Sequence, residues 1–392
     1  MDVIVGGGVV GLSVAWRLAR EGRPVTVVDP APASGASHAA AGMLAPVSEV
    51  TYTEAPLLRL GVAALRRWPA FASALAEDAA LPPAGPEEVG GLDLRAEGTL
   101  DVAFGADDMA ALDELAAFME KLDLPVERLT GRECRRLEPM LAPSVRGGLL
   151  APGDAWVNPR RVTAALLAAL ERRGVPVVRA RVSELVRTDG AVTGVRLAEP
   201  PAVPGEGRGS APLAATGGRA GGEVLAAGRV VLAAGAWSGE LAEVPVRPVK
   251  GQIMRLRSPQ PLLTRCVRGT VHGSPVYLVP RGDGELVVGA TQEELGYDTR
   301  VTAGGLYELL RDARELVPGV TELEVADVVA GLRPGTPDNL PVIGPGRTPG
   351  LTYATGHHRG GVLMAPLTAA ILMGEESELA ALCSPGRFQE IS

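Results

Sequence analysis

This chain of 392 residues has few cysteines and no long apolar segment. Its three cysteines, Cys134, Cys266 and Cys383, are odd in number and far apart, which argues against a disulfide framework and against a metal site. No stretch reaches the roughly 18 consecutive apolar residues that a membrane-spanning helix needs. The net charge is −8 without a sustained basic run, which argues against nucleic acid as a partner. We therefore expect a globular protein that binds no metal, no membrane and no nucleic acid.

Lysine is almost missing, since Lys121 and Lys250 are the only two, whereas arginine is abundant. An arginine at the surface therefore carries little information. Lys250 marks either a site that arginine cannot occupy or a leftover surface lysine, and the sequence leaves both interpretations open. The length predicts two or three domains. Because the first residues already form a core strand, without room for a leader segment, we expect a cytoplasmic protein.

The chain begins with a strand, a glycine turn and a helix. Gly6, Gly8 and Gly11 have the spacing G-x-G-x-x-G. The first glycine allows a tight turn, the second lets backbone approach a pyrophosphate, and the third lets the helix pack closely on the strand. Asp29 ends the next apolar run, where a carboxylate meets a ribose hydroxyl. An ordinary strand-to-helix turn would leave Gly8 and Asp29 unexplained, so we predict an adenine dinucleotide here. The motif alone does not distinguish NAD from FAD.

The rest of the pattern interleaves two kinds of structure. Periodicity predicts helices within residues 57–75, 109–122, 158–173, 303–316 and 361–373, and strands cluster between residues 246 and 288. A parallel α/β unit is thus assembled from the N-terminus, the middle and the C-terminus, and an antiparallel sheet with helices fills the gaps. Residues 199–222, rich in Pro, Gly and Ala, are predicted to be an inserted hairpin loop remote from function.

Two further segments suggest a binding site. Residues 34–43 are nearly all small, so their backbone can lie close to a flat ligand; a merely flexible loop is the alternative. Arg333 follows a predicted strand and precedes a predicted turn at Pro334 and Gly335. A guanidinium grips a carboxylate through two parallel hydrogen bonds, although a structural salt bridge would also explain this arginine.

These segments together resemble the D-amino-acid oxidase family of flavoproteins, and within it the glycine oxidases of bacterial thiamine biosynthesis. The resemblance covers nearly the whole chain. It rests on residues 6–11 with Asp29, and on residues 39–44, 232–238, 248–251, 277–281, 288–291, 331–336 and 356–361. Pro275, Val276 and Gln292 depart from the family pattern, which affects the expected shape of the substrate pocket.

The resemblance implies a mixed α/β (α+β) fold in which a Rossmann-like FAD-binding domain is interleaved with a substrate domain built on an antiparallel sheet. The FAD-binding domain would comprise residues 1–48, 158–240 and 331–392, and the substrate domain residues 49–157 and 241–330. The expected catalytic residues are Arg333 and Tyr277, and Arg359 is expected to join them in binding substrate. The expected contacts to noncovalent FAD are Gly6, Gly8, Val9, Val10, Gly11, Asp29, Pro30, Ala36, Ser37, Ala41, Gly42, Met43, Val182, His357, His358, Arg359, Gly360, Gly361, Val362 and Leu363.

The resemblance also implies an activity. A small amino acid such as glycine, sarcosine or a small D-amino acid would pass hydride from Cα to flavin N5, and dioxygen would be reduced to H2O2. The imine would hydrolyse to glyoxylate and ammonia or pass to thiazole synthase, and the protein would be a homotetramer. The N-terminus of the last helix would stabilise negative charge on the flavin, and His357 and His358 would either add positive charge or merely pack. A sarcosine oxidase, a D-amino-acid dehydrogenase and a flavin-binding module without turnover are the alternatives.

Overall fold

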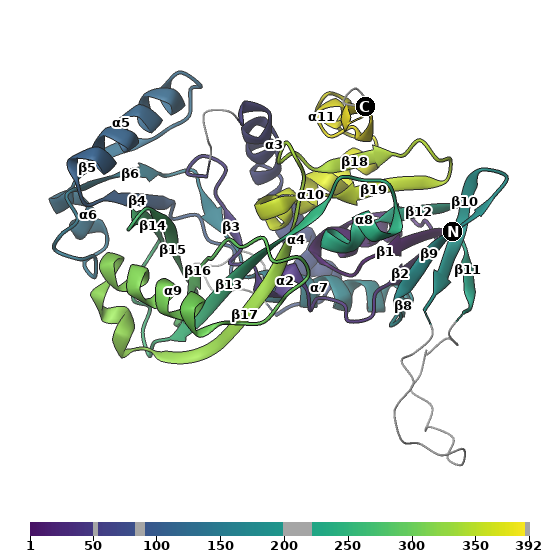
Figure 1. The fold of residues 1–392 in the computed structure, drawn as a ribbon, viewed down its shortest axis with the longest axis horizontal. Coiled ribbons are helices and arrows are strands. Elements are labelled where there is room, and N and C mark those ends of the chain that lie inside the picture. The colour runs from purple at the N-terminus through teal and green to yellow at the C-terminus, as the bar shows by residue number, and fades with distance from the viewer. Residues whose placement is uncertain (50–53, 83–90, 199–221, 389–392) are drawn as a thin grey trace, which may run out of the picture.

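The computed structural model describes residues 1–49, 54–82, 91–198 and 222–388, so most of the insertion at 199–222 lies outside the described residues. The fold is mixed α/β, as predicted, with two main sheets side by side (Figure 1). Both chain ends lie on the lobe that contains the first sheet. Within the described ranges, no helix combines the length and the apolar character that crossing a bilayer requires.

The first sheet is the predicted parallel unit. Its order is β18-β19-β12-β1-β2-β8, and all neighbours are parallel except β18 and β19. β1 and β2 are mostly apolar because both faces of the sheet are covered. The helices α1 (Val9–Arg20), α7 (Pro159–Arg172) and α10 (Gly361–Leu372) share the core cluster of one face. The strands are β1 (Asp2–Val5), β2 (Val25–Val28), β8 (Val177–Val178), β12 (Arg229–Leu232), β18 (Val342–Pro345) and β19 (Leu351–Thr355).

A three-stranded sheet covers the other face of this unit. It consists of β9 (Val182–Thr188), β10 (Ala191–Leu197) and β11 (Val224–Ala226), which are antiparallel. Its apolar side chains share a core cluster with those of β1 and β12.

The second main sheet has eight strands in the order β17-β13-β16-β15-β14-β4-β6-β5. It is antiparallel as predicted, except that β14 and β4 pair in parallel. The amphipathic helix α9 (Ala303–Leu316) packs its apolar side on this sheet. The strands are β4 (Thr99–Ala103), β5 (Glu127–Thr130), β6 (Gly147–Ala151), β13 (Arg247–Arg257), β14 (Cys266–Val271), β15 (Ser274–Pro280), β16 (Glu285–Gly289) and β17 (Glu324–Gly335).

The remaining elements are short or peripheral. They are α2 (Ala36–Ala39), β3 (Met43–Leu44), α3 (Ala55–Leu65), α4 (Trp68–Asp78), α5 (Ala106–Glu120), α6 (Gly131–Leu137), β7 (Ala155–Trp156), α8 (Ser238–Leu241) and α11 (Ser377–Leu382). Trp68 of α4 donates its indole N–H to the carbonyl of Leu363 in α10, at 2.9 Å. This contact joins α4 to α10.

One local prediction was wrong. Pro334 and Gly335 do not form a turn after Arg333, because β17 continues through Gly335 while paired with β13. Pro334 is tolerated since β17 is an edge strand of the sheet. The proposed domain boundary at residue 331 therefore falls inside a strand of the second sheet, and the division of the chain stays a prediction.

The N-terminal cap of α7 generates the first test. The Asn158 side chain accepts hydrogen bonds from the backbone N–H groups of Arg160 and Arg161. Asn158→Ala removes this acceptor and is expected to lower the free energy of unfolding by about 1 kcal/mol in urea denaturation. Asn158→Asp keeps an acceptor and serves as the control, which should stay close to the wild type. Equal losses in both variants would contradict the capping role.

Candidate active site

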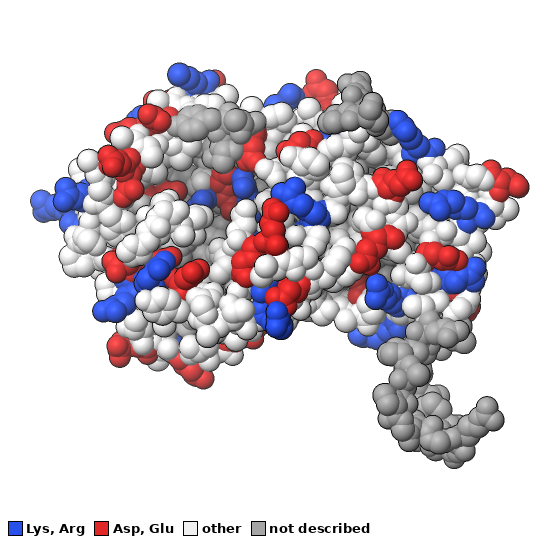
Figure 2. Space-filling model, viewed as in Figure 1, with Lys and Arg blue, Asp and Glu red and all other residues white. Residues whose placement is uncertain are grey.

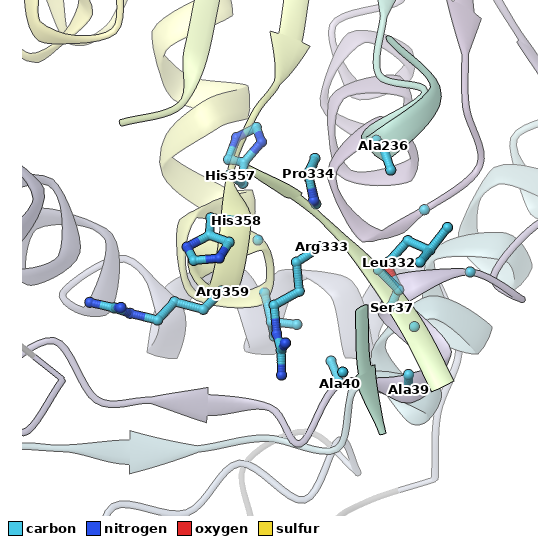
Figure 3. A pocket seen from close by; sticks show the side chains of 18 of the residues that line it. Ser37, Ala39, Ala40, Ala236, Leu332, Arg333, Pro334, His357, His358 and Arg359 are labelled. Carbon is cyan, nitrogen blue, oxygen red and sulfur yellow. The ribbon is translucent and has the colours of Figure 1, made fainter. Parts of the chain in front are cut away.

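A cavity of about 1600 Å³ lies between the two main sheets. It extends from the glycine turn after β1 to Tyr277 and the first half of α9. Figure 2 shows basic and acidic side chains interspersed over one face of the molecule, whereas Figure 3 shows small and basic residues together on the cavity wall. Of the predicted FAD contacts, all line the cavity except Gly11, Gly360 and Leu363.

The glycine turn has the geometry that its spacing predicted. Gly6 has φ +116°, a conformation that side chains rarely allow, and a Cβ on Gly11 would overlap the carbonyl of Gly6. Gly11 thus serves close packing rather than ligand contact. Gly8 is the N-cap of α1 without a side chain to cap it, so backbone N–H groups of the first turn are available to a phosphate. Ser37 approaches the same turn and accepts a hydrogen bond from the Val9 N–H at 2.9 Å.

Asp29 has a structural role that the motif did not reveal. Its carboxylate accepts hydrogen bonds from the backbone N–H of Gly7 at 2.6 Å and of Ala31 at 2.7 Å. Asp29 therefore stabilises the glycine turn through its backbone, and it also lines the cavity. Each carboxylate oxygen has further lone pairs, so Asp29 keeps acceptor capacity for a ribose hydroxyl.

The small-residue segment is held by its carbonyl groups, which no sequence pattern indicated. Three arginines donate to it: Arg160 and Arg255 to the carbonyl of His38, Arg255 also to Ala40, and Arg281 to Ala41. The side chains of Arg255 and Arg281 are fully buried. Burial lowers the pKa of Arg281 to about 10, which leaves it charged at neutral pH. The flexible-loop interpretation is wrong because this backbone is fixed from both lobes.

Arg333 enters the cavity from β17 and is directed toward Ala40 (Figure 3). Its guanidinium lies flat over Gly251 of the neighbouring strand, where a Cβ would overlap it. Its Nη1 donates to the carbonyl of Thr291 at 3.2 Å, and the carbonyl of Lys250 lies at 3.5 Å. Within the described residues no carboxylate lies within salt-bridge distance of Arg333, so the salt-bridge alternative is not what this arrangement shows.

A polar network behind Arg333 fixes the carbonyl that it contacts. The Thr291 hydroxyl donates to Glu293 at 2.6 Å and accepts from the backbone N–H of Gln252 at 2.9 Å. Lys250 is completely buried and pairs with Glu293 and Asp298, at 3.4 and 3.2 Å. The surface-lysine interpretation is therefore wrong. An ammonium fits this narrow position between two carboxylates, since it is more compact than a guanidinium.

Tyr277 lies on β15 and lines the same cavity. Its ring lies over Gly289 of the next strand, where a Cβ would overlap the hydroxyl. Burial raises the pKa of the Tyr277 hydroxyl, and the charge of Arg333 partly offsets this effect. Gly251 and Gly289 thus allow Arg333 and Tyr277 to lie side by side against the sheet.

Arg359 and the two histidines line the cavity, and each has contacts of its own within the protein. Arg359 points away from Arg333 (Figure 3), pairs with Glu54 at 2.8 Å and donates to the Glu49 carbonyl at 3.0 Å. Burial lowers the pKa of His357 to about 3, and burial with the charges of Arg333 and Arg359 lowers that of His358 to about 4. Both histidines are neutral at neutral pH and add no positive charge. His357 contacts the Thr368 hydroxyl at 2.8 Å and has the packing role.

Several lining residues lay outside the sequence prediction. Ser48, Glu49 and Arg268 line the cavity, together with the atypical Pro275, Val276 and Gln292. No motif marks the first three, because they meet only through long-range contacts: Arg268 donates to the Ser48 carbonyl at 2.7 Å. Buried Asp154 accepts from the backbone N–H groups of Val47 and Ser48 and from the Ser48 hydroxyl. It fixes the segment that carries Glu49.

The three cysteines are free and buried. Burial raises the pKa of Cys134 to about 11 and that of Cys383 to about 12, and raises the pKa of Cys266 well above its ordinary value. None of them lines the cavity. They are therefore poor nucleophiles toward a bound cofactor.

These residues fit a bound FAD. The N-terminus of α1, where Ser37 accepts only the Val9 N–H, suits a pyrophosphate, and the fixed wall of small residues suits a flat ring system. Residues 361 and 362 bring the N-terminus of α10, whose N-cap Gly360 has no side chain, to the other end of the cavity. This end favours negative charge.

Asp154 gives a pH-dependent test. Burial raises its pKa to about 6 from an ordinary 3.8, despite the hydrogen bonds from Ser48 and Val47. Between these values the folded state binds a proton that the unfolded state does not, so stability falls as pH rises through this window. Relative to Asp154→Asn, the wild type should lose about 2 kcal/mol of unfolding free energy between pH 4 and pH 6. Urea denaturation at several pH values measures this difference, and a constant difference would contradict the raised pKa.

The comparisons with known proteins agree with this geometry. The model of the FAD dependent oxidoreductase family (DAO) matches residues 3–374. The glycine oxidase of Geobacillus kaustophilus is 32% identical, with 94% of this chain and 90% of that protein covered. The crystal structure of glycine oxidase from Geobacillus kaustophilus superposes with a TM-score of 0.81, at 31% identity over 95% of this chain and 93% of that one.

Two other relatives extend the comparison. The bifunctional protein ThiO/ThiG of Nostoc is 33% identical over 94% of this chain, but the chain spans only 51% of its length. The iminodiacetate oxidase structure from Chelativorans has a TM-score of 0.78 at 26% identity, and the match covers 96% of each chain. The family match spans both lobes and the whole cavity between them. This chain belongs to the FAD dependent oxidoreductase family.

Proposed function

We propose that this protein oxidises the amine of glycine and of related small amino acids with FAD as cofactor and dioxygen as acceptor. The observation that carries the proposal is the position of Arg333. It faces the cavity, its described contacts are backbone carbonyls rather than carboxylates, and its guanidinium lies beside Tyr277 and the fixed wall at Ala40. A cation so placed has its charge available for a substrate carboxylate.

FAD supplies the acceptor for the two electrons that leave the Cα–H bond. The amino acid loses these electrons with two protons, so that a C=N bond forms. Water then adds to the carbon and the C–N bond breaks, giving glyoxylate and ammonia from glycine. Dioxygen takes up the two electrons and two protons as H2O2.

The residues of the chain position the reactants. Arg333 binds the carboxylate through two parallel hydrogen bonds and so fixes the direction of the Cα–H bonds. Tyr277 closes the pocket beside it, and the carbonyls of Thr291 and Lys250 prevent the guanidinium from turning away. For a substrate as small as glycine, this grip supplies nearly all of the available binding. We assign the predicted FAD contacts that line the cavity to the cofactor, with Gly11 as a packing residue.

A sarcosine oxidase with covalent FAD is the first alternative, and the buried cysteines favour noncovalent FAD instead. We further propose that the imine or glyoxylate is passed on toward thiazole assembly, since a relative joins ThiO to ThiG in one chain. A homotetramer in the cytoplasm, with thiazole synthase as its partner, completes the proposal.

Replacing Arg333 tests the carboxylate grip. Arg333→Leu is expected to raise the KM for glycine about 100-fold, because a charge-assisted bidentate contact is lost. Bound FAD should be unchanged in its absorbance spectrum. Arg257→Leu, an exposed arginine at the other end of the same strand pair, is the control. Glycine turnover by Arg333→Leu with an unchanged KM would contradict the assignment.

A substrate panel tests the reaction itself. Glycine, sarcosine and small D-amino acids should release peroxide under air and bleach the flavin absorbance without oxygen. Bleaching without peroxide would indicate a dehydrogenase, and no bleaching with any of them would indicate a module without turnover.

Denaturation tests the mode of cofactor binding. Acid-precipitated protein should leave its yellow colour in solution, because the three cysteines are buried and away from the cavity. Colour that stays with the protein pellet would show a covalent bond.

A further inference from the structure

A second arginine faces the cavity on the far side of Tyr277. Arg268 of β14 stands directly opposite Tyr277 of β15 in the antiparallel register, so both side chains project from the same face of the sheet. Arg333, on β17, reaches the same cavity from the other side of Tyr277. Arg333, Tyr277 and Arg268 therefore follow one another along the wall of the pocket, and Glu49 lines the same cavity.

The guanidinium of Arg268 is only partly engaged. Its Nη1 donates to the Ser48 carbonyl at 2.7 Å, and its Nε lies 3.9 Å from the Asp101 carboxylate. Among the residues that the structure describes, Nη2 has no hydrogen-bond partner. The side chain is 19% exposed, and the accessible part lines the cavity. Donor capacity thus remains for a bound anion.

The spacing of the two arginines suits a dicarboxylate. The Arg333 guanidinium lies over Gly251 of β13, and β16 and β15 separate that strand from β14. Three strand spacings amount to roughly 14 Å, and Gly251 lies two residues, roughly 7 Å, along β13 from the register of Arg268, so the two backbone positions are about 15–16 Å apart. In an extended N-carboxymethylglycine the two carboxyl carbons are about 5 Å apart, and each would lie about 4 Å from the guanidinium carbon that binds it. The distance between the two arginine positions and the length of the substrate with its two guanidinium contacts therefore agree within the reach of flexible arginine side chains.

We propose that Arg268 binds a second substrate carboxylate and thereby directs this enzyme toward amines with a carboxymethyl group on nitrogen, such as iminodiacetate. The proposal rests on the proposed function, in which Arg333 binds the first carboxylate. In iminodiacetate one Cα–H bond and the N–H bond break, and a C=N bond forms. Water adds to the carbon and the C–N bond breaks, releasing glyoxylate and glycine, while dioxygen is reduced to H2O2. The product glycine is itself a substrate under the proposed function.

Sarcosine and iminodiacetate form a matched pair for the test, because they differ only in a carboxylate on the N-methyl group. In the wild type we expect the KM for iminodiacetate to be at or below that for sarcosine. Arg268→Gln should lower kcat/KM for iminodiacetate roughly 10- to 100-fold more than for sarcosine. Arg268→Lys keeps the charge and should retain part of the preference. Arg257→Gln is the control and should leave the ratio unchanged.

A bracing role for Arg268 predicts another result. If Arg268 only holds Ser48 and Asp101, both substrates lose the same factor, and the proposal is overturned. A wild-type KM for iminodiacetate far above that for sarcosine overturns it as well. Calorimetric binding of iminodiacetate to the oxygen-free holoenzyme separates the two proposals. Binding that depends on Arg268 without any turnover would reject the oxidase function and keep the anion site. Glycine turnover without such binding would do the reverse.

Discussion

The capture of backbone carbonyls by buried arginines is the interaction on which the rest of this structure depends. The segment at residues 38–41 has almost no side chains with which to anchor itself. Arginines of α7, β13 and the end of β15 hold it instead through the carbonyl groups of residues 38, 40 and 41. These donors come from both lobes, so one set of hydrogen bonds fixes the wall of the cavity and the relation between the two sheets.

Such an arrangement is costly. Taking a guanidinium out of water costs several kcal/mol, and the Nε atoms of Arg255 and Arg281 have no hydrogen-bond partner within the described residues. The carboxylate of Glu285 offsets part of this cost, since it lies 2.6 Å from Nη1 of Arg255. Removing either arginine would leave buried carbonyls without donors, which costs about 1–3 kcal/mol for each group. The wall of small residues is therefore held in place by buried arginines whose desolvation costs free energy.

The sequence predicted a feature correctly where residues close together in the chain determine it. The glycine turn follows from spacing within a few residues, the cap of α7 follows from Asn158 and Pro159, and the interleaved fold follows from the order of the predicted strands and helices. The sequence did not predict features that depend on contacts with a strand far away in the chain. Nothing in the sequence marks Gly251 and Gly289 as special. In the structure, the side chains of Arg333 from β17 and Tyr277 from β15 lie over them. Pro334 and Gly335 look like a turn because the pairing of β17 with β13 cannot be read locally.

The net charge at the site also depends on contacts between residues that are distant in the sequence. Glu293 and Asp298 balance the charge of Lys250. Glu54 balances the charge of Arg359, although Glu54 lies far from Arg359 in the sequence. Burial keeps both neighbouring histidines neutral. Arg333 differs from these groups because its described partners are carbonyls, which orient a guanidinium without cancelling its charge. The polar network behind it thus has a clear physical role: Glu293 and Asp298 neutralise the lysine next to Arg333, so the charge of that buried lysine adds little to the field in the substrate pocket.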